Sequence, residues 1–121
     1  MATLNMTGRL ATCLPLMLGS GYSARNYQDH QDAMQKLFGP FDKLSPVPEV
    51  LEVAVDLQGR LFKAGIGRSV GVADLMVAAH ALHYRRQGAA VTLVHYDAYY
   101  DHLARVAPEL HTQWLVPRGS L

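Results

Sequence analysis

Two aspartates bracket the stretch of this chain that most restricts its fold. Asp74 opens a run at residues 75–79 that has good helix formers, no helix breaker and apolar side chains on nearly every face. Such a helix is expected to be buried. Asp97 directly follows residues 91–96, whose β-branched and aromatic side chains predict a strand. A helix start and the end of a strand are both places where an α/β fold gathers ligands, so the two carboxylates predict a cation site.

Strand-like and helix-like segments alternate along the rest of the chain. Residues 9–13 predict a short buried strand, and residues 41–47 predict a linker or an edge strand. Helices are expected from Pro15, where Gly19 and Gly21 should keep the segment short, and at residues 27–38, 48–65 and 99–107, with a last strand at 113–116. Residues 1–7 give no clear assignment. This alternation predicts an α/β fold with a parallel sheet and right-handed crossovers.

The composition limits the class of protein. The 121 residues, half of them apolar, suffice for one domain, and we expect a single domain over residues 1–121. A net charge of +1 excludes the strongly basic surface of a protein that coats nucleic acid without specificity. The lone Cys13 cannot form an internal disulfide, and no apolar run reaches the roughly 18 to 20 residues of a membrane span. The expected location is therefore the cytoplasm.

Several motifs resemble those of one protein family. VADLMVAAHAL, VTLVHYDAYYDHLARV and the ending TQWLVPRGSL are similar to the C-terminal half of PIN-domain ribonuclease toxins of the VapC family, from type II toxin–antitoxin systems. The similarity continues upstream through LATC, GYSARN and IGRSV. It implies a PIN-like three-layer sandwich with a mostly parallel sheet flanked by helices. It also implies an endoribonuclease that depends on Mg2+, with Mn2+ as a substitute.

The same resemblance implies which residues form the site. Asp74 and Asp97 would be catalytic and would hold the cation, and Asp101 is a further candidate metal ligand that is otherwise a solvated helix residue. The family's first acid lies on a D-[TS]-S strand upstream of where this chain begins, so the domain is expected to be N-terminally truncated. The absent strand lies centrally in the family's sheet, and its neighbours would then have unpaired edges. The family's second acid is matched by Gly19, and a later one by Tyr99.

Two functions follow from the resemblance and these departures. The first is a VapBC-type endoribonuclease toxin, with weakened or lost activity, that acts on RNA and is restrained by a VapB-type antitoxin. The alternative is a non-catalytic PIN remnant that binds an antitoxin or dimerises. In both cases we expect a homodimer and no contact with a membrane.

Each candidate residue also has a structural interpretation. Asp74 could cap its helix, and Asp97 could form a turn between strand and helix. Zinc is disfavoured because the chain has neither an H-E-x-x-H pattern nor a cysteine pair, although histidines occur at positions 80, 83, 95 and 102. Cys13 is a poor nucleophile if its surroundings are apolar. Arginines could contact phosphates or be solvated charges (Arg25, Arg68, Arg85 and Arg86), and tyrosines could stack on a base or pack the strand-to-helix corner (Tyr96, Tyr99 and Tyr100).

Overall fold

One mixed β-sheet organises the part of the chain that the structure describes. The computed structural model describes residues 2–95 and 98–115. Within them, five strands pair in the order β3 (Asp42–Leu44), β2 (Arg9–Cys13), β1 (Ala2–Met6), β4 (Val91–His95) and β5 (Thr112–Trp114). The strands predicted from residues 9–13 and 91–96, and the edge strand predicted within 41–47, are confirmed as β2, β4 and β3.

The central strand runs against the other four. β2 pairs with β3 and β4 pairs with β5 in parallel, whereas β1 pairs antiparallel with both β2 and β4. Two of the four pairings are therefore parallel, so the expectation of a mostly parallel sheet is only partly met. Because β1 lies between β2 and β4 and pairs with both, the expectation of unpaired inner edges is wrong. The strand was missed because residues 2–6, ATLNM, alternate apolar and polar side chains over only five positions and include Ala and Asn, which are depleted in strands.

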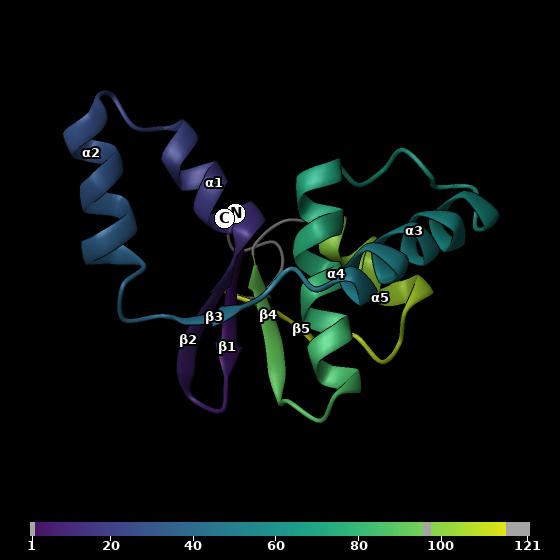
Figure 1. Ribbon diagram of the computed structural model, residues 1–121. Coiled ribbons are helices and arrows are strands. Elements are labelled where there is room, and N and C mark those ends of the chain that lie inside the picture. The colour runs from purple at the N-terminus through teal and green to yellow at the C-terminus, as the bar shows by residue number, and fades with distance from the viewer. Residues whose placement is uncertain (1, 96–97, 116–121) are drawn as a thin grey trace.

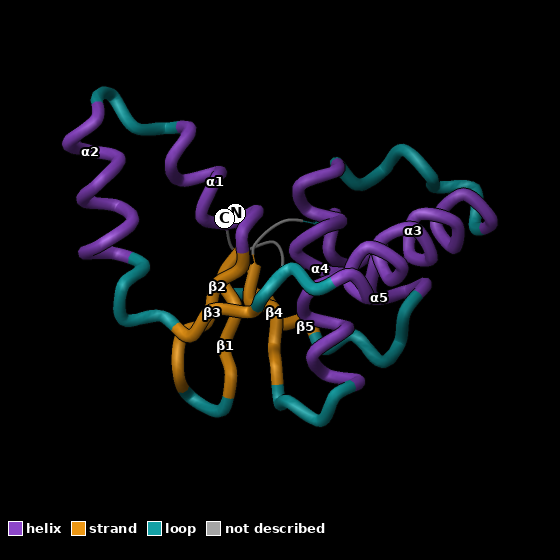
Figure 2. The backbone as a smooth tube through the Cα atoms, viewed as in Figure 1, coloured by secondary structure: helices purple, strands orange, loops and turns teal. Residues whose placement is uncertain are grey.

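A tight hairpin explains how β1 can enter the centre of the sheet (Figure 2). β1 and β2 are joined by Thr7 and Gly8, which have φ values of 54° and 81°. Two residues with positive φ are what a type I′ turn requires, and that turn has the twist that suits an antiparallel hairpin. The register pairs Met6 with Arg9 directly across the turn.

Replacing Gly8 by alanine is therefore expected to destabilise the fold by about 1 kcal/mol, because a Cβ is disfavoured at positive φ. The midpoint of urea unfolding should fall with an unchanged slope. Gly59 is the matched control, since it lies inside a helix where a Cβ would meet nothing within 4 Å. Gly59→Ala should stabilise the protein by up to about 1 kcal/mol. A Gly8→Ala variant as stable as the parent would show that the turn does not need a left-handed residue.

The helices lie in two groups around the sheet (Figure 1). α1 (Leu14–Tyr22) and α2 (Tyr27–Asp32), which continues into the π-helical turn η1 (Ala33–Leu37), project from the end where β2 stops. The other three gather together on one side: α3 (Pro48–Lys63), α4 (Val72–Arg86) and α5 (Tyr99–Val106). The architecture is α/β and consistent with a PIN-like sandwich. No helix in the described part of the chain is both long and apolar enough to cross a membrane.

Helix α4 is the centre of the hydrophobic core, as its apolar sequence predicts. Nearly every residue from Leu75 to His83 is buried, and its neighbour α3 contributes one apolar face to the same cluster. From the sheet, Leu4, Ala11 and Leu93 lie side by side in the register and are buried against it. This packing fixes the first turn of α4, and with it Asp74, relative to the edge of the sheet.

Candidate active site

Asp74 lies in the first turn of α4, at the rim of an open hollow. Gly71 is the N-cap of this helix, so Asp74 is not its cap, and its carboxylate lies where unpaired helix N–H groups favour a negative charge. The hydroxyl of Tyr100, in the first turn of α5, donates a hydrogen bond of 2.8 Å to Oδ1 of Asp74. Oδ2 has no hydrogen-bond partner among the described residues and is available to a ligand.

The hollow next to Asp74 has a volume of about 400 Å³. It is lined by the beginning of β1 (Ala2 and Thr3), the end of β2 (Ala11 and Thr12), the side of α1, and the segment that leads to β3. β2 and β4 end at the edge of the sheet where β1 begins, because β1 alone is reversed. Ligands of α/β sheets gather at that edge, so the hollow lies where the sequence predicted a site.

Gly19 lines the same hollow as Asp74. It lies inside α1, and a Cβ at this position would meet nothing within 4 Å. A longer side chain could therefore enter the space without displacing backbone. The match of Gly19 to the family's second acid, which the sequence resemblance implies, stays a prediction.

The other two predicted acids are Asp97 and Asp101. Asp97 lies outside the described residues, so its place in the site remains a prediction. Asp101 is not among the described residues that line the hollow, and its Oδ1 accepts a hydrogen bond of 3.1 Å from the Trp114 indole. Among the described residues, no group of three or more His, Cys, Asp or Glu side chains is arranged to hold a metal ion.

Cys13 and three of the candidate histidines, His80, His83 and His95, are buried, whereas His102 is half-buried. His95, the last residue of β4, packs its ring 4.9 Å from the rings of both Tyr100 and Trp114. This aromatic group supports Tyr100, which in turn holds Asp74. Burial raises the pKa of the Cys13 thiol to about 11, which removes the nucleophilic thiolate near neutral pH.

His80 is buried inside the core on α4. Its Nδ1 lies 2.7 Å from the carbonyl oxygen of Met76 and donates to it in the tautomer that fits, while Nε2 has no partner among the described residues. Burial lowers the pKa of His80 from its ordinary value of 6.5, although the contact with Met76 opposes the shift.

This shift predicts that the protein loses stability as the pH falls below about 6.5, the ordinary histidine pKa. The unfolded chain takes up a proton at that pH, whereas folded His80 takes it up only at a lower pH. The unfolded state thus binds more protons, and acid favours it. A His80→Leu variant should lose the part of the acid sensitivity that His80 causes. The measurement is a smaller difference between its unfolding free energies at pH 7 and pH 5.5. An unchanged difference would assign the acid sensitivity to other groups.

The tyrosines and arginines have varied roles. Tyr100 is buried at the helix corner and binds Asp74, Tyr99 is half exposed, and Tyr96 lies outside the described residues.

Three of the four candidate arginines bind protein groups: Arg25 pairs with Asp29, Arg86 with Glu109, and Arg85 donates to the Val91 carbonyl. None of the four is among the described residues that line the hollow. Sequence reasoning missed that Tyr100 holds Asp74. It also missed that Phe38 and Phe41 form an aromatic wall of the hollow.

Comparison with known proteins identifies the family. No family model matches the chain. Ribonuclease VapC18 of Mycobacterium tuberculosis is 32% identical over 118 residues, which covers 93% of this chain and 79% of that protein. Ribonuclease VapC21 of the same species is 28% identical over 113 residues, covering 93% and 78%. Because VapC18 is more than 30% identical over 93% of this chain, the chain belongs to the VapC family.

Proposed function

We propose that this protein is a metal-dependent endoribonuclease of a VapBC-type toxin–antitoxin pair. The observation that carries the proposal is the position of Asp74, which faces an open hollow at the ligand-binding edge of the sheet in a chain of the VapC family. Its relatives are named ribonucleases. An acid at this place is what phosphodiester cleavage with a hard cation needs.

In this proposal Asp74 and Asp97 hold Mg2+, for which Mn2+ can substitute. The residues present fit such an ion in part, because Asp74 lines the hollow, Tyr100 holds its Oδ1, and its Oδ2 has no hydrogen-bond partner among the described residues. A bound divalent cation would lower the pKa of a water and neutralise charge on the scissile phosphate. The His95 ring packs between Tyr100 and Trp114, and this packing supports the tyrosine that holds the carboxylate. Asp101, whose Oδ1 accepts a hydrogen bond from Trp114, is a weaker candidate for a third ligand.

The departures at Gly19 and Tyr99 imply a weak enzyme. Gly19 has no side chain to ligate a cation across the hollow, and Tyr99 has no carboxylate. Two carboxylates hold Mg2+ loosely, because this ion keeps its waters and demands near-ideal octahedral geometry. Cleavage should therefore require millimolar Mg2+ or the more readily bound Mn2+.

Helix α1 supports the proposal of protein partners. It has no charged residue and no buried residue, and Leu14, Leu18 and Tyr22 form an exposed apolar strip at four-residue spacing. An apolar strip of this kind is typical of a protein interface. We assign the partners as a VapB-type antitoxin and a second copy in a homodimer, in a reducing cytoplasm that suits the unpaired Cys13.

The missing carboxylates at Gly19 and Tyr99 and the exposed apolar strip on α1 favour one second candidate. This is a non-catalytic member of the family that binds an antitoxin. The test is incubation of the purified protein with a mixed RNA pool in Mg2+, Mn2+ or EDTA. Cleavage that appears with either metal and disappears in EDTA supports the nuclease. Intact RNA under all three conditions, together with a stable complex with a VapB-type antitoxin, supports the binding module instead.

A further inference from the structure

We infer that the hollow beside Asp74 binds one unpaired nucleobase of an RNA strand. This inference rests on the proposed function and deepens it, since it names which part of the substrate enters the site. The hollow has a volume of about 400 Å³, which lies within the range of pockets that enclose small ligands. Asp74 stands at its rim, so a base in the hollow would bring its own phosphate close to the carboxylate.

The walls of the hollow suit a flat, weakly polar group. Leu16 contributes from α1, and Leu37, Phe38 and Phe41 contribute from η1 and the segment after it. The rings of Phe38 and Phe41 meet edge to face, with centroids 5.5 Å apart and planes at 81°. RNA bases that leave the stack are commonly held against such side chains.

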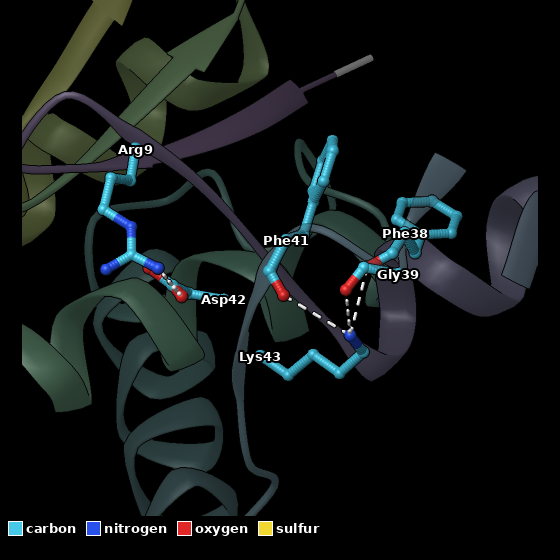
Figure 3. Close-up of polar contacts among 6 residues, drawn as sticks. All are labelled: Arg9, Phe38, Gly39, Phe41, Asp42 and Lys43. Atoms are coloured by element: carbon cyan, nitrogen blue, oxygen red, sulfur yellow. Dashed lines mark hydrogen bonds and ion pairs between the residues drawn. The ribbon is translucent and has the colours of Figure 1, made fainter. Parts of the chain in front are cut away.

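The aromatic wall is held in place before any ligand arrives. Figure 3 shows the Lys43 ammonium donating to the carbonyl oxygens of Phe38 at 3.0 Å, Phe41 at 3.3 Å and Gly39 at 3.5 Å. Beside it, Arg9 pairs with Asp42 at 2.8 Å and ties this segment to the hairpin. A wall fixed in this way loses little freedom when a ligand binds.

Charge decides which part of an RNA the hollow can take. No lysine or arginine is among the described residues that line it, and Asp74 is their one carboxylate. A phosphate inside would find no cation among these residues, and burying its charge would be costly. A neutral base meets neither penalty, so the base enters the hollow and the phosphate stays at the rim.

A buried hydroxyl supplies the polar contact that a base needs. Thr12 lines the hollow and is fully buried, and its Oγ1 has no hydrogen-bond partner among the described residues. A hydroxyl both donates and accepts, so it can pair with a ring nitrogen, a carbonyl or an amino group on a base edge. A buried polar atom without a partner destabilises the fold, so a base that displaces the side chains covering Oγ1 of Thr12 would gain from pairing with it.

The test measures binding of the four free ribonucleosides to the metal-free protein in EDTA, by chemical-shift titration up to about 10 mM. Nucleosides carry no phosphate, so their binding is independent of cleavage and of the cation. At least one nucleoside should bind, with Leu37→Ala weakening it at least about threefold through lost apolar contact. Leu51→Ala is the matched control, because Leu37 and Leu51 are similarly exposed, at 52% and 56%, and Leu51 does not line the hollow. The Leu51→Ala variant should bind the nucleoside with the same affinity as the parent protein.

Thr12→Val tests the polar contact, since it keeps the shape of the side chain and removes the hydroxyl. The preferred nucleoside should lose about fivefold in affinity while the others change less. Binding without RNA cleavage would support the base pocket and remove the nuclease function. Cleavage with no nucleoside binding, equal losses in Leu37→Ala and Leu51→Ala, or a hollow that responds to a VapB-type peptide but to no nucleoside would each overturn the inference.

Discussion

Replacing Asp74 by asparagine is expected to reduce metal-dependent RNA cleavage by at least about 100-fold, equal to ~2.7 kcal/mol of transition-state stabilisation. The amide oxygen can still accept the Tyr100 hydroxyl, so the side chain should keep its position while it loses the negative charge that holds a cation. The measurement is the initial rate of cleavage of a fixed RNA in Mg2+ and in Mn2+, with thermal unfolding run beside it. The loss should concern the rate far more than the stability.

Asp56 provides the matched control for this substitution. It is an exposed aspartate on α3, paired with Arg60 at 3.0 Å, and it is not among the described residues that line the hollow. Asp56→Asn should change stability by less than about 1 kcal/mol and leave the cleavage rate unchanged. If Asp74→Asn and Asp56→Asn cleave RNA equally well, Asp74 is not part of the active site and the proposed function loses its main support.

Much of the fold could be predicted from the sequence because its elements have strong local signals. Helix α4 was predicted because its residues are apolar on nearly all sides, and α3 because its apolar residues recur at helical spacing. Strand β1 has only a weak local signal, because its alternation of apolar and polar side chains spans just five residues. Its central, reversed position is set by pairing with β2 and β4 and by a turn at Thr7 and Gly8, and these are tertiary facts that no short window of sequence contains.

The candidate site shows the same division between local and tertiary information. Asp74 was predicted because an acid before a buried helix is a recognisable local pattern. The Tyr100 hydroxyl that binds it belongs to another helix, 26 positions along the chain, and no sequence pattern distinguishes Tyr100 from its neighbour Tyr99. Thr12, Leu37 and Phe41 meet at the hollow only because β2, η1 and the segment before β3 converge there. Their types alone are those of ordinary core and surface residues.

Introducing glutamate at Gly19 is expected to increase Mn2+ affinity at least about tenfold, equal to ~1.4 kcal/mol. Gly19 shares the hollow with Asp74, and a Cβ there meets nothing within 4 Å, so a carboxylate can enter the space opposite Asp74. A second oxygen ligand of this kind is what a hard or borderline cation requires. The readout is the Mn2+ dissociation constant from calorimetry, together with the rise in unfolding temperature that saturating Mn2+ produces. RNA cleavage should increase in parallel.

Two controls separate metal binding from a general gain in stability. Gly19 and Gly59 are both inside helices with open space around the position of a Cβ, so glutamate at either should stabilise its helix by up to about 1 kcal/mol. Only Gly19→Glu should also gain Mn2+ affinity. Gly19→Gln has nearly the same shape without the charge and should bind Mn2+ no better than the parent. Equal Mn2+ affinities in Gly19→Glu and Gly19→Gln would mean that position 19 does not face a cation site.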